Sequence, residues 1–304
     1  MPPYKSNNPK PNSKANETSL KVTEQAELMT FLLAKMGGMS RNSVKSLLSH
    51  RQVSVNNKVT TLYYTVLKPG DNVSISSSKG NTELTHPKLR ILFEDNSLIV
   101  VLKKEGLLTV STGKTDETTA FSILKNHVKK ASSQNRIYVV HRLDRETSGV
   151  IIFAKNRETQ LALQENWHKI ILKRIYVAVV EGKPEKGKDT IITWLTENEK
   201  SLKVHSSAIN NGGQQAITHY KLLKSNDKLS LLELELETGR KNQIRVHMHE
   251  LGTPVTGDKK YGAGFNPLGR MALHARLIEF IHPDTGKKVR FETPIPTEFL
   301  KVVK

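Results

Sequence analysis

The stretch that decides the fold is Ile137–Ile152, which reads IYVVHRLDRETSGVII. Apolar and β-branched residues at both of its ends predict that one strand enters the stretch and another leaves it. Between them, charged and polar side chains are concentrated in a loop that the flanking strands anchor to the core. Catalytic groups are often carried by loops of this kind.

Asp144 lies in the middle of this loop, between Arg142 and Arg145. Neighbouring cations favour the charged form of a carboxyl group, so we expect Asp144 to be ionised at neutral pH. An ionised carboxylate can act as a nucleophile or as a base. Composition alone favours a simpler interpretation, in which this is an exposed loop of salt-bridged side chains.

Working outward, the composition excludes several classes of protein. The chain has 304 residues and no cysteine, which excludes disulfide frames, zinc–cysteine sites, iron–sulfur clusters and thiolate nucleophiles. The longest apolar run, Leu98–Leu102, is far shorter than the roughly 20 residues that span a bilayer. No apolar signal core stands at the N-terminus, and we expect a cytoplasmic protein without a membrane partner.

The net charge of +18 is the strongest compositional signal. In a chain of this size it indicates a polyanionic partner, with nucleic acid as the first candidate, although a generally basic surface would give the same number. The patterns GxGxxG and GxxxxGK are both missing, so we expect no nucleotide cofactor.

The N-terminal quarter predicts a basic tail followed by a small domain. Residues 1–19 have scarcely any apolar side chains and are expected to be disordered. Residues 20–77 then combine two short helices with small strands. The first helix carries Leu28 and Leu32 and ends at Gly37-Gly38, and the second begins after Ser40. Residues 78–90 are predicted to be a linker.

This small domain resembles the alpha-L RNA-binding motif of a ribosomal protein and some tRNA-handling enzymes. The resemblance rests on the two basic helices, on VSVNNK and on LKPGDNVSI, and it implies RNA contacts by Arg41, Lys45 and Arg51. The motif usually has a glycine where this chain has His50-Arg51, and an ordinary small α+β domain is the alternative.

Residues 91–304 predict a single α+β domain with many strands and with helices at 118–130 and 157–169. Within it, HRLDRETSG at residues 141–149 resembles the HRLDRxTSG signature of the RluA family of pseudouridine synthases. The segments Lys173–Gly182, with Tyr176, and Thr238–His247, with Arg245, resemble further motifs of that family in the same order. Shorter matches lie at residues 257–262, 273–275 and 282–286. The family often has Thr-His where this chain has Lys241-Asn242, and often has a proline near Glu105.

The resemblance implies a mixed, largely antiparallel sheet with flanking helices and a central cleft. It also implies an enzyme that isomerises uridine in RNA to pseudouridine without a cofactor, with Asp144 as catalyst. By the family's pattern, Arg245 pairs with Asp144 and Tyr176 stacks on the uracil. Arg142 fills the gap left by a flipped nucleotide, and Arg240 is a further RNA contact. Asp144 would either attack the substrate covalently or remove the C2′ proton of the sugar, and both routes stay open.

Ribosomal RNA is the first expected substrate and tRNA the second, for a protein that we expect to act as a monomer. Two other functions are possible alternatives. A non-catalytic RNA-binding or assembly factor would not need the intact Asp144, Tyr176 and Arg245. A glycoside hydrolase normally needs a pair of carboxylates, and the signature presents one.

His247, His249, Glu250, Asp258 and His274 could be taken for a metal cluster. Ile244, Met248 and Leu251 recur at helical spacing, however, so His247 and His249 are expected on nearly opposite sides of a helix. We therefore predict no metal site, and we expect His141 and His274 to be hydrogen-bonded framework residues.

Overall fold

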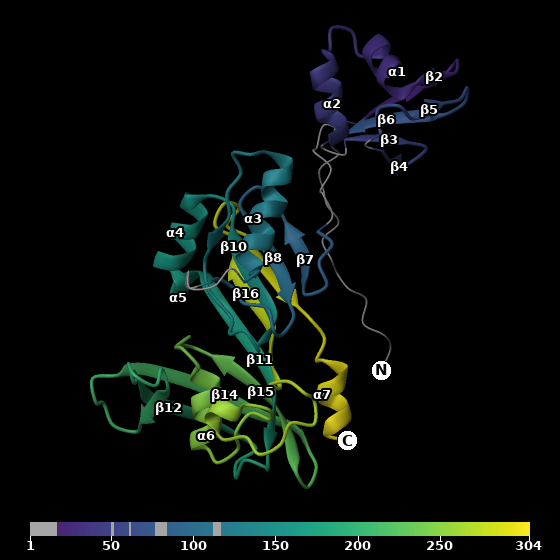
Figure 1. Cartoon of the computed structure of the whole chain (residues 1–304). Coiled ribbons are helices and arrows are strands. Elements are labelled where there is room, and N and C mark those ends of the chain that lie inside the picture. The colour runs from purple at the N-terminus through teal and green to yellow at the C-terminus, as the bar shows by residue number, and fades with distance from the viewer. Residues whose placement is uncertain (1–16, 50–51, 61, 77–83, 112–116) are drawn as a thin grey trace. The chain divides into compact units, whose positions relative to one another are not determined.

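The computed structural model of the chain describes residues 17–49, 52–60, 62–76, 84–111 and 117–304 (Figure 1). The chain forms two compact units. The smaller unit takes residues up to Glu83 together with His127–Gln134, and the larger takes Leu84–Asn126 and Asn135–Lys304. No helix in the described part is long and apolar enough to cross a membrane.

The smaller unit packs two helices on short strands, as predicted. Leu28, Leu32, Val44 and Leu48 form its core, because apolar residues recur on one face of each helix. The backbone N–H of Ser43 donates to Ser40 Oγ at 3.1 Å, so Ser40 caps the second helix. The helices are α1 (Leu28–Lys35) and α2 (Arg41–Ser49), and the strands are β1 (Glu17–Lys21), β2 (Ala26–Glu27), β3 (Val53–Val55), β4 (Lys58–Val59), β5 (Val66–Leu67) and β6 (Asn72–Ser76).

Two boundaries read from the sequence were wrong. Residues 17–19, assigned to the basic tail, belong to β1, which pairs antiparallel with β6 from Glu17↔Ser76 to Lys21↔Asn72. Leu89 and Arg90, assigned to the linker, begin β7 and pair with β8. In both places a partner strand distant in sequence supplies the backbone hydrogen bonds. Local composition does not predict this pairing. The remainder of the predicted tail, residue 77 of the predicted small domain and residues 78–83 of the predicted linker lie outside the described residues.

Within the described part, the larger unit is built on an eleven-stranded sheet. Its order is β13-β12-β14-β15-β11-β16-β10-β8-β7, with β17 on β16 and β9 on β10. All its pairs are antiparallel except β10–β16, which confirms the predicted mixed, largely antiparallel sheet. The strands are β7 (Leu89–Glu94), β8 (Leu98–Lys103), β9 (Tyr138–Val139), β10 (Ser148–Ala154), β11 (Ile171–Glu181), β12 (Lys188–Glu197), β13 (Val204–Ser207), β14 (Gln214–Ser225), β15 (Leu229–Leu236), β16 (Leu273–Ile281) and β17 (Lys288–Glu292).

Strand β10, which follows the Asp144 loop, is buried along its whole length because β8 and β16 flank it. Gly149 makes this packing possible. A Cβ atom at Gly149 would lie 2.2 Å from the carbonyl oxygen of Ala275 in β16, and the φ angle of Gly149 is +129°. Only glycine accepts both conditions, so this position fixes how closely β16 approaches the end of the loop.

Helices cover the sheet at several places. Helix α4 packs against β10, and α6 packs against β13 and β14 (Figure 1). The predicted helix 157–169 is two helices, because the backbone of Asn166 leaves the helical conformation between them, with φ −108° and ψ 23°. The helices are α3 (Ala120–Ala131), α4 (Arg157–Glu165), α5 (Trp167–Ile170), α6 (Gln243–Glu250), the 3₁₀ helix η1 (Lys259–Tyr261) and α7 (Thr297–Val302).

Candidate active site

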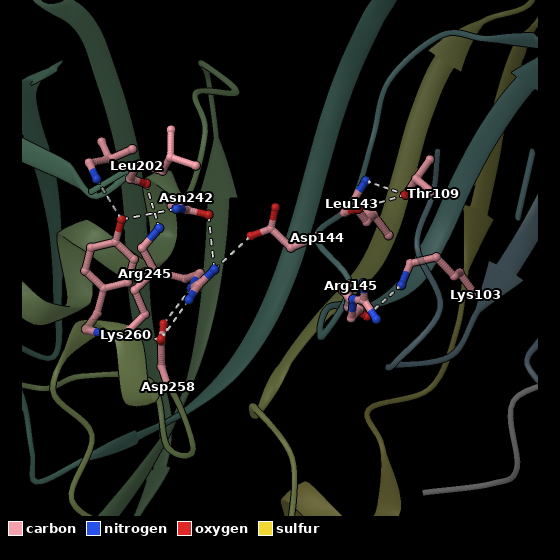
Figure 2. A network of polar contacts seen from close by, with 12 residues as sticks. Lys103, Thr109, Leu143, Asp144, Arg145, Leu202, Asn242, Arg245, Asp258 and Lys260 are labelled. Atoms are coloured by element: carbon pink, nitrogen blue, oxygen red, sulfur yellow. Dashed lines mark hydrogen bonds and ion pairs between the residues drawn. The ribbon is translucent and has the colours of Figure 1, made fainter. Parts of the chain in front are cut away.

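Asp144 lies in the loop between β9 and β10, and its two chain neighbours are held by the segment that follows β8. On one side, Thr109 Oγ1 donates to the carbonyl oxygen of Leu143 at 2.7 Å, and the Leu143 N–H donates to the same hydroxyl at 3.2 Å. On the other side, the Gly106 N–H donates to the carbonyl oxygen of Arg145 at 2.8 Å. Figure 2 shows the contacts of Thr109 with Leu143 next to Asp144. The carboxylate is therefore presented by a backbone that has little freedom to move.

Lys103, at the end of β8, is a buried cation behind this loop. Its Nζ donates to the carbonyl oxygens of Leu107 at 2.8 Å, Lys104 at 3.1 Å and Arg145 at 3.2 Å. Burial lowers the pKa of Lys103 to about 8, although the charges of Glu146, Asp144 and Glu105 act in the opposite direction. Lys103 thus ties the turn at 104–107 to the Asp144 loop.

Asp144 faces Arg245 of α6 across the cleft. Arg245 Nη1 donates to Asp144 Oδ2 at 3.2 Å, and the side chain of Asp144 keeps 30% of its surface exposed. Burial alone would lower the pKa of Arg245, but the hydrogen bonds and charges of Asp258 and Asp144 raise it above its usual value. The guanidinium is therefore a permanent cation beside the carboxylate.

These two residues lie on the wall of a cleft of about 350 Å³. Tyr176 from β11 also lines it, and burial raises the pKa of its phenol, which keeps the ring neutral. The apolar part of the lining comes from Leu143, Leu236, Ile244 and Leu273. A volume of this size is within the usual range for sites that enclose a small ligand.

The structure brings five of the predicted site residues to this one cleft: Arg142, Asp144, Tyr176, Arg240 and Arg245. Arg41 and Lys45 lie elsewhere, on the exposed surface of α2 in the smaller unit. Arg51 lies outside the described residues. Lys241 and Asn242, where the chain departs from the family's usual residues, also line the cleft.

Arg145, which is next to Asp144 in the sequence, pairs with Glu117. Its Nη1 and Nη2 donate to the two carboxylate oxygens of Glu117 at 2.8 and 2.7 Å, in a geometry typical of a two-bond arginine–carboxylate pair. The cation that meets Asp144 comes from α6, a hundred residues later in the chain.

The histidines in this part of the molecule make hydrogen bonds within the fold. His247 contacts the hydroxyls of Thr218 and Thr193 at 2.9 Å, and burial lowers its pKa to about 4. His274 lies between Ser148 at 2.8 Å and Thr293 at 2.9 Å. His141 Nε2 accepts from the N–H of Ile152 at 3.0 Å. No group of three metal-ligating side chains is found among the residues that the structure describes.

Sequence reasoning missed Lys103 and Thr109 and gave Asp258 no role beside Arg245. A lysine that ends the apolar run of β8 was a usable signal for Lys103, because a charged side chain there must find partners. Asp258 was considered as a metal ligand and as part of the match at residues 257–262, and neither gave it a contact with Arg245. Its contact with Arg245 joins two segments that no local pattern relates.

Comparisons with known proteins identify the family of the chain. Residues 97–250 match the family model of the RNA pseudouridylate synthases. The chain is 37% identical over 264 residues to the uncharacterized RNA pseudouridine synthase YhcT of Bacillus subtilis, covering 85% of this chain and 86% of that protein. It is 31% identical to the ribosomal large subunit pseudouridine synthase D of Nitrosomonas europaea, covering 94% and 87% respectively.

Among solved structures, the human RNA pseudouridylate synthase domain containing 4 has the same fold. The TM-score is 0.57 at 23% sequence identity, over 69% of this chain and 90% of that one. Sequence motifs, fold and family match agree, and the chain belongs to the RNA pseudouridine synthases, a family of isomerases.

Proposed function

We propose that the chain converts specific uridines of structured RNA to pseudouridine, with Asp144 as the catalytic carboxylate. The observation that carries the proposal is the ion pair between Asp144 and Arg245 in a cleft that Tyr176 also lines. The reaction breaks the bond between C1′ and N1 of the nucleoside, turns the uracil and rejoins it through C5. It transfers nothing to an outside acceptor, so one carboxylate in an enclosed site suffices.

In this proposal each residue of the cleft has a different role. Asp144 acts on the substrate, and Arg245 keeps it charged and oriented. Tyr176 stacks on the uracil, a contact worth roughly 1 to 3 kcal/mol for a base on an aromatic ring. The apolar side chains of Leu236, Ile244 and Leu273 limit the access of water to the separated base.

The substrate nucleotide must leave the base stack to enter the cleft, because its reacting atoms are shielded inside a helix. Arg142 lines the cleft next to Asp144 with an exposed side chain, which supports a role in filling the vacated space. Arg240 and Lys241 add cations to the same rim, and Arg41 and Lys45 of α2 provide a second basic surface. A net charge of +18 supports RNA as the substrate over a neutral sugar.

Ribosomal RNA is the substrate that we propose, supported by the relative named as a ribosomal large subunit pseudouridine synthase. The test incubates the purified chain with ribosomal RNA and with bulk tRNA, each from cells that lack this protein. New pseudouridines are mapped by a chemical adduct that stops reverse transcription. New sites in ribosomal RNA alone are the expected result. New sites in tRNA alone would identify tRNA as the substrate. Binding of both RNAs without new sites would favour a non-catalytic assembly factor.

A further inference from the structure

The guanidinium of Arg245 makes two hydrogen bonds to one carboxylate and one to another. Its Nε and Nη2 donate to the two oxygens of Asp258 at 2.6 and 2.8 Å, whereas Asp144 receives a single bond of 3.2 Å from Nη1. That Nη1 is also shared with the side-chain oxygen of Asn242 at 3.1 Å. Two parallel bonds to one carboxylate are stronger and more directional than one long bond, so Asp258 is the principal partner of Arg245.

The two carboxylates also differ in how deeply they are buried. The side chain of Asp258 is 1% exposed, against 30% for Asp144. Asp258 Oδ1 also accepts from the backbone N–H of Tyr261 at 3.3 Å, which fixes the carboxylate at the start of η1. A buried, doubly bonded pair of this kind holds its geometry, because breaking it leaves a buried charge unmatched.

Tyr261 and Asn242 complete the enclosure of Arg245. The guanidinium carbon lies 5.0 Å from the centre of the Tyr261 ring, within range of a cation–π contact. The Tyr261 hydroxyl accepts from Asn242 Nδ2 at 3.1 Å and from the Val204 N–H at 3.1 Å. Figure 2 shows Asp258 below Arg245, Asn242 above it and Asp144 at its far end. Arg245 is thus held by groups that are not the proposed catalyst.

We propose that Asp258 is a positioning residue that anchors Arg245, so that Arg245 orients Asp144 without pairing with both of its oxygens. Without Asp258, the Nε and Nη2 donors would be free to turn toward Asp144, and a two-bond pair there would hold the carboxylate away from the substrate. The inference rests on the proposed function, because it assigns Asp258 a place in that reaction.

The first measurement needs no RNA. In protein labelled with ¹⁵N-arginine, the side-chain Nε–H signal of Arg245, assigned by its loss in Arg245→Lys, should be sharp and slow to exchange. It should persist in Asp144→Asn, disappear or broaden in Asp258→Asn, and persist in the control Asp189→Asn, whose exposed carboxylate pairs with Lys186. Loss of the signal in Asp144→Asn, or its survival in Asp258→Asn, would overturn the anchor. The Asp144→Asn arm decides even if Asp258→Asn does not fold.

The second measurement is the single-turnover rate on a ribosomal RNA transcript labelled with [5-³H]uridine. Asp258→Asn should slow conversion by about tenfold or more at unchanged RNA affinity, because a small displacement of a catalytic group has effects of that order. Combined with Arg245→Lys, it should cause no further loss beyond about twofold. Full additivity of the two changes, or a wild-type rate in Asp258→Asn, would contradict the positioning role. A wild-type chain that converts no RNA would count against the proposed function, and the Arg245 signal would still decide whether Asp258 is the anchor.

Discussion

At the scale of single residues, the backbone on both sides of Asp144 is held by two residues that do not line the cleft, Thr109 and Lys103. Thr109 brackets the backbone of Leu143, and Lys103 reaches the carbonyl oxygen of Arg145. A catalytic side chain needs a rigid support, since a shift of about 1 Å can cost a hundredfold in rate. The buried ammonium of Lys103 is therefore part of the site although no substrate would meet it.

Because Lys103 titrates in the alkaline range, the free energy of unfolding of the larger unit should depend on pH there. Its pKa is about 8 in the folded chain and about 10.5 in the unfolded chain, so between these values the unfolded state binds more protons. The free energy of unfolding should then rise with pH across that window, by at most about 1.4 kcal/mol per pH unit. Lys103→Met removes the titrating group, so its unfolding free energy should lack this rise.

The measurement is urea denaturation from pH 7 to 10.5, followed by the fluorescence of Trp167 and Trp194, the chain's two tryptophans, which both lie in the larger unit. The difference in unfolding free energy between wild type and Lys103→Met should grow above pH 8. Lys104→Met, at an exposed neighbour, is the control. A difference that stays constant with pH would show that Lys103 does not titrate in this window.

The sequence indicated the residue roles unevenly. Asp144, Tyr176 and Arg245 could be selected because each stands in a recognisable motif, and all three line one cleft. The pairing of Arg145 with Glu117 and that of Arg245 with Asp258 could not be selected. The carboxylate with which an arginine pairs depends on distance and burial in the folded chain, and the local sequence predicts neither.

At the scale of secondary-structure elements, the site depends on the packing of β10 against β16. Both strands were expected from their apolar runs, and the helix before Gly252 was expected from its spacing. Their pairing was not, because strand order across a sheet is decided by long-range hydrogen bonds. The parallel contact of Ser148 and Gly149 with His274 and Ala275 brings β16 to the end of the Asp144 loop.

Gly149 is the position where this packing is most sensitive to substitution. Gly149→Ala would place a Cβ atom 2.2 Å from a backbone oxygen at a φ angle of +129°, so β10 and β16 would have to separate. We expect a loss of more than about 3 kcal/mol in unfolding free energy, measured by the same tryptophan fluorescence.

Gly212→Ala is the matched control, because Gly212 also has a positive φ angle (+82°) but open space around its Cα. It should cost only about 1 kcal/mol, the cost of the backbone conformation without a clash. Equal losses in the two variants would mean that the close approach of β16 contributes nothing.

At the scale of the whole molecule, the sheet brings together residues that are far apart in the chain. Asp144 comes from the loop before β10, Tyr176 from β11 and Arg245 from α6, which packs on β14, and all three line the cleft. The fold class followed from the motifs, whereas the starts of β1 at Glu17 and of β7 at Leu89 depend on strand pairs that local composition does not predict. The smaller unit adds a second basic surface on α2.

If α2 increases affinity for RNA, charge reversal there should weaken binding more than it slows the reaction of bound RNA. Arg41→Glu/Lys45→Glu should lower affinity for a folded ribosomal RNA fragment by about tenfold or more at low salt, because each lost phosphate contact forfeits counterion release. The single-turnover rate at saturating enzyme should stay near the wild-type value. Lys221→Glu/Lys224→Glu, on exposed residues of β14, controls for the change in total charge. Equal losses in both double variants would assign the effect to net charge alone.

Asp144→Asn keeps the size and shape of the side chain and removes its charge, so it tests whether this carboxylate is the catalyst. Wild type and variant are compared on the same ribosomal RNA transcript, with RNA binding and thermal unfolding measured in parallel. We expect the variant to fold, to bind RNA with nearly the wild-type affinity and to form no pseudouridine above background. A folded Asp144→Asn that still forms pseudouridine would contradict the assignment of Asp144 as the catalyst.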